Sequence, residues 1–280
     1  MNSPTIEILQ GCFKQLQNED NTPRFLYHYT KFESAIRILA SGRLFMRSLE
    51  KQNDPWEFLD REDTGIAVID QSIEESSENL RKHDHAIAER KNIVRQTSFS
   101  IDTERLHGWN LTRMWAQYAD NHNGVCLIFD YKQLCDDFEA AFADKAPPPF
   151  HNPIDYVNLH KLDKLEEKYW EPNTTFLDEA HIELLFTKHN DFEHEQEYRF
   201  LAADCSLKNS NENLHFPIKN SFCGLITGKR FCLEDNRDVI LLRMKHLRDA
   251  MNLCNRKSLL FNMDPDKFSE PLFIPEEEIP

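Results

Sequence analysis

The run Glu195-Gln196-Glu197-Tyr198-Arg199 places two carboxylates and a guanidinium at every second position. Successive side chains of a β-strand point to opposite faces, so a strand here would put Glu195, Glu197 and Arg199 on one face. These three groups are costly to bury unless they pair with one another or bind something. The pattern therefore predicts either a ligand-binding face or the solvated face of an edge strand whose charges form ion pairs.

A second informative segment lies near the start of the chain. Residues 25–29 are aromatic and aliphatic, which predicts a strand. Thr30 followed by Glu33 is typical of a helix N-cap with a capping box, and Gly42 is typical of the end of that helix. His28 would then lie at a strand end just before a helix N-terminus, where free N–H groups suit a phosphate or ribose. The alternative is a histidine that is satisfied within the core.

Strands and helices are mixed along the chain without strict alternation, which predicts the α+β class. Strands are expected at 93–101, 125–129, 196–203, 222–227 and 258–263, and helices at 111–118, 158–189 and 234–253. The strand at 25–29 is expected to lie close to the strand at 196–202, since both carry polar residues where a buried strand should be apolar.

The composition is that of a soluble globular protein with an aromatic-rich core, at 40% hydrophobic and 11% aromatic residues. The net charge of -15 argues against tight nonspecific binding to nucleic acid. There is no apolar run of membrane-spanning length and no signal peptide, so we expect a cytoplasmic protein without a membrane partner. The seven scattered cysteines form no C-x-x-C and fit reduced thiols, and no metal is expected.

Other side chains have two interpretations each. Asn53, Asp54 and Glu57 face the same cleft as the acidic run, or they form an Asx turn that caps a helix. Trp115 and Tyr118 lie one helical turn apart, where they stack on a nicotinamide or adenine ring or pack in the core.

Four segments together resemble the bacterial family known as domain of unknown function 2971, over roughly residues 25–230. They are Tyr27-His28-Tyr29-Thr30 with Ile38-Leu39-Ala40-Ser41-Gly42; Asn53-Asp54-Pro55-Trp56-Glu57; Ser98-Phe99-Ser100 with Met114-Trp115-Ala116-Gln117-Tyr118; and Glu195-Gln196-Glu197-Tyr198-Arg199.

The same segments have a more distant resemblance to ADP-ribosyltransferases, including the DNA-modifying toxin branch. This resemblance implies a mixed, mainly antiparallel central sheet with peripheral helices over residues 23–265. Helical insertions are implied near 57–91 and 158–189, between an N-terminal helix at 1–22 and a loose acidic tail at 266–280.

The resemblance also implies roles for individual residues. Glu197 matches the catalytic glutamate and Glu195 the glutamate that orients the acceptor. Binding of NAD is implied for His28, Tyr29, Thr30, Ser98, Ser100, Tyr118 and Arg199. The chain departs from the pattern in lacking a Ser-Thr-Ser sequence and in carrying an arginine within the acidic run.

Cleavage of NAD between nicotinamide and ribose develops an oxocarbenium-like cation, which a carboxylate such as Glu197 stabilises. Glu195 would orient or deprotonate an acceptor, and Arg199 would pair with a glutamate or bind the pyrophosphate. The resemblance thus implies an NAD-consuming ADP-ribosyltransferase-like enzyme, such as a bacterial toxin or phage-defence effector, with NAD as substrate and an unknown protein or nucleic-acid acceptor.

Two alternatives remain open. The first is a nonenzymatic nucleotide-binding or protein-binding module on the same fold. The second is a metal-dependent nuclease built on Asp54, Glu195 and Glu197, although the missing lysine after the acidic pair and the acidic balance of the chain count against it.

Overall fold

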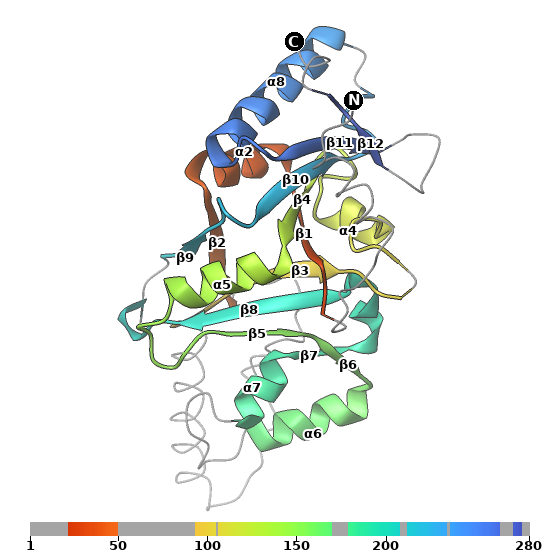
Figure 1. Ribbon diagram of the computed structural model, residues 1–280. Coiled ribbons are helices and arrows are strands. Elements are labelled where there is room, and N and C mark those ends of the chain that lie inside the picture. The colour runs from red at the N-terminus through yellow and green to blue at the C-terminus, as the bar shows by residue number, and fades with distance from the viewer. Residues whose placement is uncertain are drawn as a thin grey trace, which may run out of the picture.

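The computed structural model describes residues 22–49, 93–104, 106–169, 179–207, 212–233, 236–263 and 271–275. These residues form an α+β fold around a ten-stranded, mostly antiparallel sheet, which confirms the predicted class and the mixed character of the sheet (Figure 1). Among the described residues, no helix is long and apolar enough to cross a membrane.

The main path of the sheet joins eight strands. In spatial order they are β12 (Pro271–Phe273), β11 (Leu259–Met263), β10 (Phe222–Thr227), β4 (Val125–Asp130), β1 (Phe25–Thr30), β3 (Val94–Ile101), β2 (Arg43–Ser48) and β9 (Leu214–Pro217). The other long edge of β3 pairs with β8 (Glu197–Ala203), which in turn pairs with β5 (Phe150–Pro153). The β10–β11 pair is parallel. A separate parallel pair joins β6 (Asp155–Val157) and β7 (Thr187–His189).

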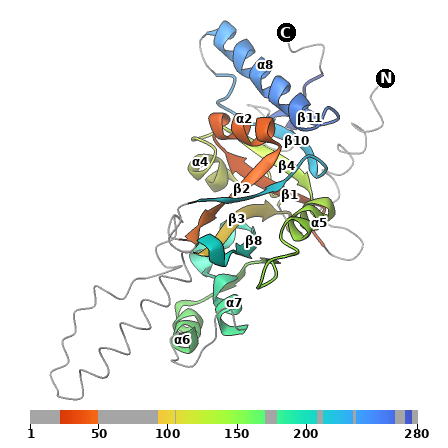
Figure 2. The same cartoon turned by 90° about the vertical axis from the view of Figure 1, so that its left-hand side faces the viewer.

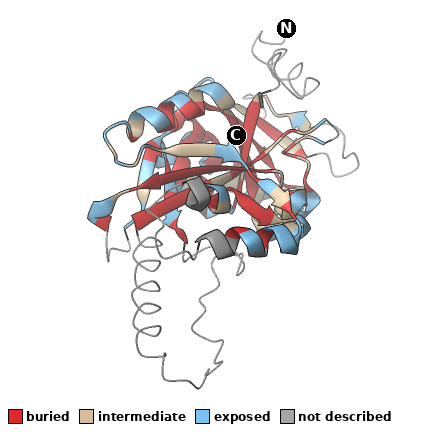
Figure 3. Ribbon diagram, turned by 90° about the horizontal axis from the view of Figure 1, so that it is seen from below, coloured by how far each residue is buried: buried red, intermediate tan, exposed pale blue. Residues whose placement is uncertain are grey.

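Helices cover both faces of the sheet. They are α2 (Phe32–Ser41), α4 (Thr112–Gln117), α5 (Tyr131–Ala141), α6 (Leu159–Tyr169), α7 (Glu179–Leu185) and α8 (Arg237–Cys254), with the short 3-10 helices η3 (Asn190–Glu195) and η4 (Cys205–Leu207). Buried side chains of α2, α5 and α8 pack on one face of the sheet, and those of α4 and α7 pack on the other. The strands are therefore mostly buried, while the outer surfaces of the helices are exposed (Figure 3).

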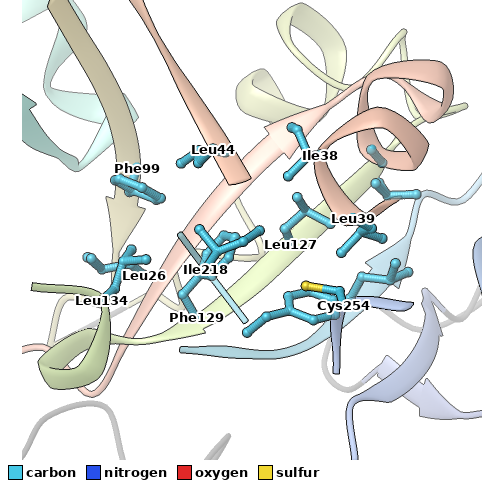
Figure 4. Close-up of a cluster of buried hydrophobic side chains, with 14 of the residues drawn as sticks. Leu26, Ile38, Leu39, Leu44, Phe99, Leu127, Phe129, Leu134, Ile218 and Cys254 are labelled. Atoms are coloured by element: carbon cyan, nitrogen blue, oxygen red, sulfur yellow. The ribbon is translucent and has the colours of Figure 1, made fainter. Parts of the chain in front are cut away.

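The larger core cluster contains one face of the central strands. Leu26, Leu127 and Phe129 from β1 and β4 meet Ile38 and Leu39 of α2 in this cluster (Figure 4). These side chains are almost completely removed from water, which is the main favourable contribution to folding.

The edge of β3 that faces β1 is shared by two strands. Ser100 and Ile101 pair with β1, whereas Arg95 and Gln96 pair with β2. Between them, at residues 97–99, neither strand pairs with β3. The sheet therefore splits at the middle of β3, on the edge opposite β8.

The strands predicted at 93–101, 125–129, 196–203, 222–227 and 258–263 correspond to β3, β4, β8, β10 and β11. Gly42 ends α2 with a φ of 63°, a left-handed conformation that a glycine adopts without strain, as predicted. The predicted N-cap at Thr30 is wrong, because β1 continues through Thr30 and Lys31 occupies the cap without a side-chain hydrogen bond.

Some of the other predicted elements are wrong, and some lie outside the described residues. The helix expected over 158–189 corresponds to α6 and α7 within the described residues, and it is wrong for its last three residues, because β7 occupies 187–189. β11 is not the last strand, since β12 follows it. The expected N-terminal helix, the insertion at 57–91, most of the acidic tail, and the residues Asn53, Asp54 and Glu57 lie outside the described residues.

Candidate functional site

The two glutamates of the acidic run come from different elements. Glu197 is the first residue of β8, but Glu195 ends the 3-10 helix η3. Gln196 joins them in a left-handed conformation with a φ of 47°, which is uncommon for a residue other than glycine. The prediction that all three charged side chains project from one strand is therefore wrong for Glu195 and holds for Glu197 and Arg199.

β8 is an interior strand rather than an edge. It pairs with β3 on one side and β5 on the other, and every one of its residues is buried. Glu195 and Glu197 are each 4% exposed and Arg199 is 1% exposed. The alternative of a solvated edge strand is therefore wrong.

The carboxylate of Glu197 accepts several short hydrogen bonds. The Arg199 guanidinium donates in a bidentate manner, from Nε to Oε1 at 2.7 Å and from Nη2 to Oε2 at 3.1 Å. The hydroxyl of Ser98, on the neighbouring strand β3, donates to Oε1 at 2.6 Å. Because Ser98 is paired with Arg199 in the ladder, these three side chains share one face of the sheet.

Lys188 completes this cluster, and the sequence analysis missed it. The residue lies on β7, and its Nζ is 2.9 Å from Glu195 Oε2 and 2.7 Å from Glu197 Oε2. One buried ammonium thus bridges the two carboxylates. The available signal was a lysine seven residues before Glu195 and just after the apolar run Leu184-Leu185-Phe186, but such a lysine is usually exposed.

The two carboxylates and two cations balance in charge, and we call Lys188, Glu195, Glu197 and Arg199 the charge cluster. Burial on its own would raise the pKa of Glu197, but the nearby Arg199 and Lys188 outweigh burial and lower this pKa to about 2. Glu197 is therefore ionised at neutral pH, which a carboxylate must be if it is to stabilise a developing cation.

Tyr118 and Ser100 also contact the acidic run. The Tyr118 hydroxyl, at the end of α4, donates to Glu195 Oε1 at 3.1 Å. The Ser100 hydroxyl donates to the backbone carbonyl of Glu195 at 2.8 Å and is fully buried. Ser100 therefore stabilises the turn that carries Glu195, while Ser98 is the serine whose hydroxyl contacts the carboxylate of Glu197.

His28 lies at the split of the sheet, near the charge cluster but on the other side of the strands. Its Nδ1–H donates to the backbone carbonyl of Ser98 at 3.0 Å, and its ring contacts Phe99 with centroids 5.6 Å apart. Ser98 thus connects His28, through its carbonyl, with Glu197, through its hydroxyl. Burial, followed by the nearby charge of Arg47, lowers the pKa of His28, so the imidazole is neutral at pH 7.

Tyr29 and Thr30 are buried and do not contact the charge cluster. The Tyr29 hydroxyl donates to the carbonyl of Gly108 at 2.7 Å, and its ring packs edge-on against Trp115. Trp115 is 1% exposed and donates its Nε1–H to the carbonyl of Trp109. For Trp115 the core-packing interpretation is the one that the structure supports.

The strands that carry the predicted site are close but not adjacent. β3 alone separates β1 from β8, with Tyr27 opposite Ser100 and Ser100 opposite Glu197. The structure thus brings Ser98, Ser100, Tyr118, Arg199 and both glutamates together, and connects His28 to them through Ser98. Among the described residues, no group of three or more histidine, cysteine and acidic side chains has the arrangement of a metal site.

Residues 114–200 match the family model described as protein of unknown function (DUF2971). This stretch runs from α4 to β8 and includes the charge cluster, so the predicted family resemblance is confirmed for this part of the chain. No curated protein and no solved structure matches the chain. The resemblance to ADP-ribosyltransferases is thus not shown by these comparisons and stays a prediction.

Proposed function

We propose that this protein cleaves NAD at the bond between nicotinamide and ribose and transfers the ADP-ribosyl group to a macromolecular acceptor. Support comes mainly from one observation, which is that two carboxylates share one site. Glu197 is ionised and accepts a hydrogen bond from Ser98 on the neighbouring strand, and the Lys188 amine that contacts Glu197 also lies 2.9 Å from the carboxylate of Glu195. Two carboxylates that share one site are a recurrent arrangement for breaking glycosidic bonds.

The proposed roles follow from the chemistry of the transfer. As the bond between ribose C1′ and the nicotinamide nitrogen breaks, its electron pair leaves with nicotinamide and positive charge develops on the ribose. Glu197 stabilises that charge. Glu195 takes the proton of the attacking hydroxyl or amine of the acceptor, whose oxygen or nitrogen forms the new bond to C1′.

Access of NAD to Glu197 requires that Lys188 move. Its ammonium is hydrogen-bonded to Glu195 and lies within 2.7 Å of Glu197, and both carboxylates are buried. The nicotinamide ring of NAD is itself a cation, so its entry in place of the ammonium would keep the charge balance of the cluster. Arg199 is less available for the pyrophosphate, because its Nη1 donates to the Leu185 carbonyl and its other nitrogens donate to Glu197.

A nonenzymatic binding module is the second candidate. It is favoured by the same contacts, because the carboxylate of Glu197 already has four partners: the Ser98 hydroxyl, two nitrogens of Arg199 and the Lys188 ammonium. These four use the acceptor capacity of a carboxylate. Under this alternative the charge cluster holds η3 and β7 against β8, and a nucleotide or protein binds elsewhere on the fold.

The test is nicotinamide release by the full-length protein incubated with NAD, measured by chromatography, together with NAD binding followed by nuclear magnetic resonance. Glu197→Gln keeps the volume of the side chain and removes its charge. We expect nicotinamide release by the wild type and its loss in this variant. Glu193→Gln, at an exposed position of η3, is the matched control and should keep the activity.

The outcomes distinguish the two candidates. Equal release by wild type and Glu197→Gln would mean that this carboxylate is structural. NAD binding without release in either protein would favour the binding module. Neither binding nor release of NAD by the wild type would refute the proposal.

A further inference from the structure

Helix α8 carries apolar side chains on its exposed surface as well as on its buried one. Leu242 is 53% exposed and Leu253 is 65% exposed, while Met244, Leu247 and Met251 pack into the core. The two exposed leucines are separated by about three helical turns, so they lie on the same side of the helix. In Figures 1 and 2 α8 lies at the end of the molecule opposite α6 and α7.

The same exposed surface carries unpaired charges. Lys245 and Asp249 lie between the two leucines in sequence and are both exposed. Within the part of the chain that the structure describes, neither side chain has a hydrogen bond or an ion pair, although a lysine and an aspartate four residues apart are able to pair on a helix. Asp238 at the start of α8 and Arg256 just after its end are likewise exposed and unpaired.

These residues are arranged symmetrically about Leu247. Lys245 and Asp249 are each two positions from it, with opposite charges, and Asp238 and Arg256 are each nine positions from it, again with opposite charges. If a second copy of α8 lay antiparallel with a twofold axis at the level of Leu247, Lys245 and Asp249 would each face the opposite charge on the other copy, and Arg256, just beyond the end of the helix, would lie at the same end of the contact as Asp238 of the other copy. The isologous contact of a twofold dimer requires this kind of self-complementarity.

We propose that α8 is a dimerisation surface that binds the α8 of a second copy of this chain in the antiparallel orientation. In this arrangement Leu242 of each copy lies beside Leu253 of the other, so two apolar leucine pairs flank the twofold axis, one on each side. Lys245 of each copy pairs with Asp249 of the other, and these pairs fix the register.

The test is sedimentation of the full-length protein over a concentration series, with three variants of this surface. We expect the wild type to form a dimer. Lys245→Glu places two glutamate–aspartate pairs across the axis, and Asp249→Lys places two lysine–lysine pairs there. Each change should raise the dissociation constant by about tenfold or more, because two ion pairs beside the twofold axis become two repulsions. The double variant Lys245→Glu/Asp249→Lys restores opposite charges and should dimerise like the wild type.

Two further variants control for charge alone. Lys132→Glu and Asp136→Lys make the same changes at exposed positions of α5 and should leave the dissociation constant unchanged. Thermal melts would verify that all variants fold. A monomeric wild type, single variants that dimerise like the wild type, or a folded double variant that stays as weak as the single ones would each overturn the proposal.

Discussion

The two faces of β8 are both buried, yet they are stabilised by opposite kinds of chemistry. Tyr198 and Phe200 project into an aromatic core, where the Phe200 ring stacks on Phe138 of α5 with centroids 4.7 Å apart. Glu197 and Arg199, at the alternate positions, project into the charge cluster. A face made of rings needs only shape complementarity, whereas a face made of charges is stable only while every charge keeps its partner.

The difference arises from what covers each face. α5 brings Leu134 and Phe138 over the aromatic face. β7 and η3 bring Lys188 and Glu195 over the charged face, with the carbonyl of Leu185 accepting a further hydrogen bond from Arg199. The alternation along one strand is therefore matched by two different sets of covering elements.

The largest effect is expected on the aromatic face. Phe200→Ala should lower the free energy of unfolding by about 3–5 kcal/mol, because it leaves a cavity among Phe138, Phe99 and Phe216. Denaturant unfolding at pH 7 and at pH 3 measures this loss in the free energy of unfolding. The loss relative to wild type should be similar at both values, since no titrating group is removed; a loss confined to one pH would contradict this account.

A somewhat smaller effect is expected on the charged face. Arg199→Met should cost about 3 kcal/mol at pH 7, because Glu197 loses its bidentate partner while it remains buried. Arg37→Ala, at an exposed position of α2, is the control and should change stability by less than about 0.5 kcal/mol.

The cost of Arg199→Met should depend on pH. In the wild type the pKa of Glu197 is about 2, so the stability that its ionised form contributes is present above its ordinary pKa and is lost as the pH falls towards 2. In the variant, Arg199 no longer opposes the effect of burial on the pKa of Glu197, so this carboxylate takes up a proton at a higher pH than in the wild type. Its protonation removes the free-energy cost of a buried charge that has lost its partner. The difference between the two proteins should therefore narrow at pH 3; a constant difference would mean that the variant acts through packing alone.

Removal of the serine hydroxyl should have a moderate effect. Ser98→Ala deletes the donor to Glu197 Oε1 and should cost about 2 kcal/mol, the range for a hydrogen bond to a charged group. Tyr198→Phe is the comparison on the aromatic face, where the hydroxyl hydrogen-bonds with the ring of His151 at 2.9 Å rather than with a carboxylate, and should cost about 1 kcal/mol. Urea unfolding of both variants measures the difference, and equal costs would remove the distinction between the faces.

The smallest effect concerns His28. Because burial lowers its pKa in the folded state, the unfolded chain binds a proton first as the pH falls below the ordinary histidine value of about 6.5, and stability is lost there. His28→Gln should make the melting temperature less dependent on pH between about 7 and 5. An unchanged pH dependence in this variant would show that other groups cause it.

Much of the fold could be predicted from local patterns. β4 was predicted from its continuous apolar run, and the end of α2 from the glycine that follows it, because apolar spacing and a left-handed cap are properties of neighbouring residues. The pairing of Arg199 with Glu197 could also be predicted, since alternation along a strand puts residues two apart on the same face.

The position of Glu195 could not be predicted in this way. Because Gln196 adopts a left-handed conformation, β8 begins only at Glu197, and Glu195 takes no part in the alternation of side chains along the strand. No glycine marks the turn, so the sequence resembled one continuous strand. The Ser100 hydroxyl and the Ile101 amide hold this turn through hydrogen bonds to the carbonyls of Glu195 and Gln196.

The sequence by itself determined that this chain forms an α+β protein with two carboxylates and an arginine concentrated in one short run. Only the tertiary structure decided that the run is buried, that Lys188 bridges the two carboxylates, and that His28 reaches them through Ser98. Periodicity reports which side of its own element a residue occupies. It does not report which element packs on that side, because this depends on contacts between residues far apart in the chain, and those contacts decide whether a buried charge finds its partner.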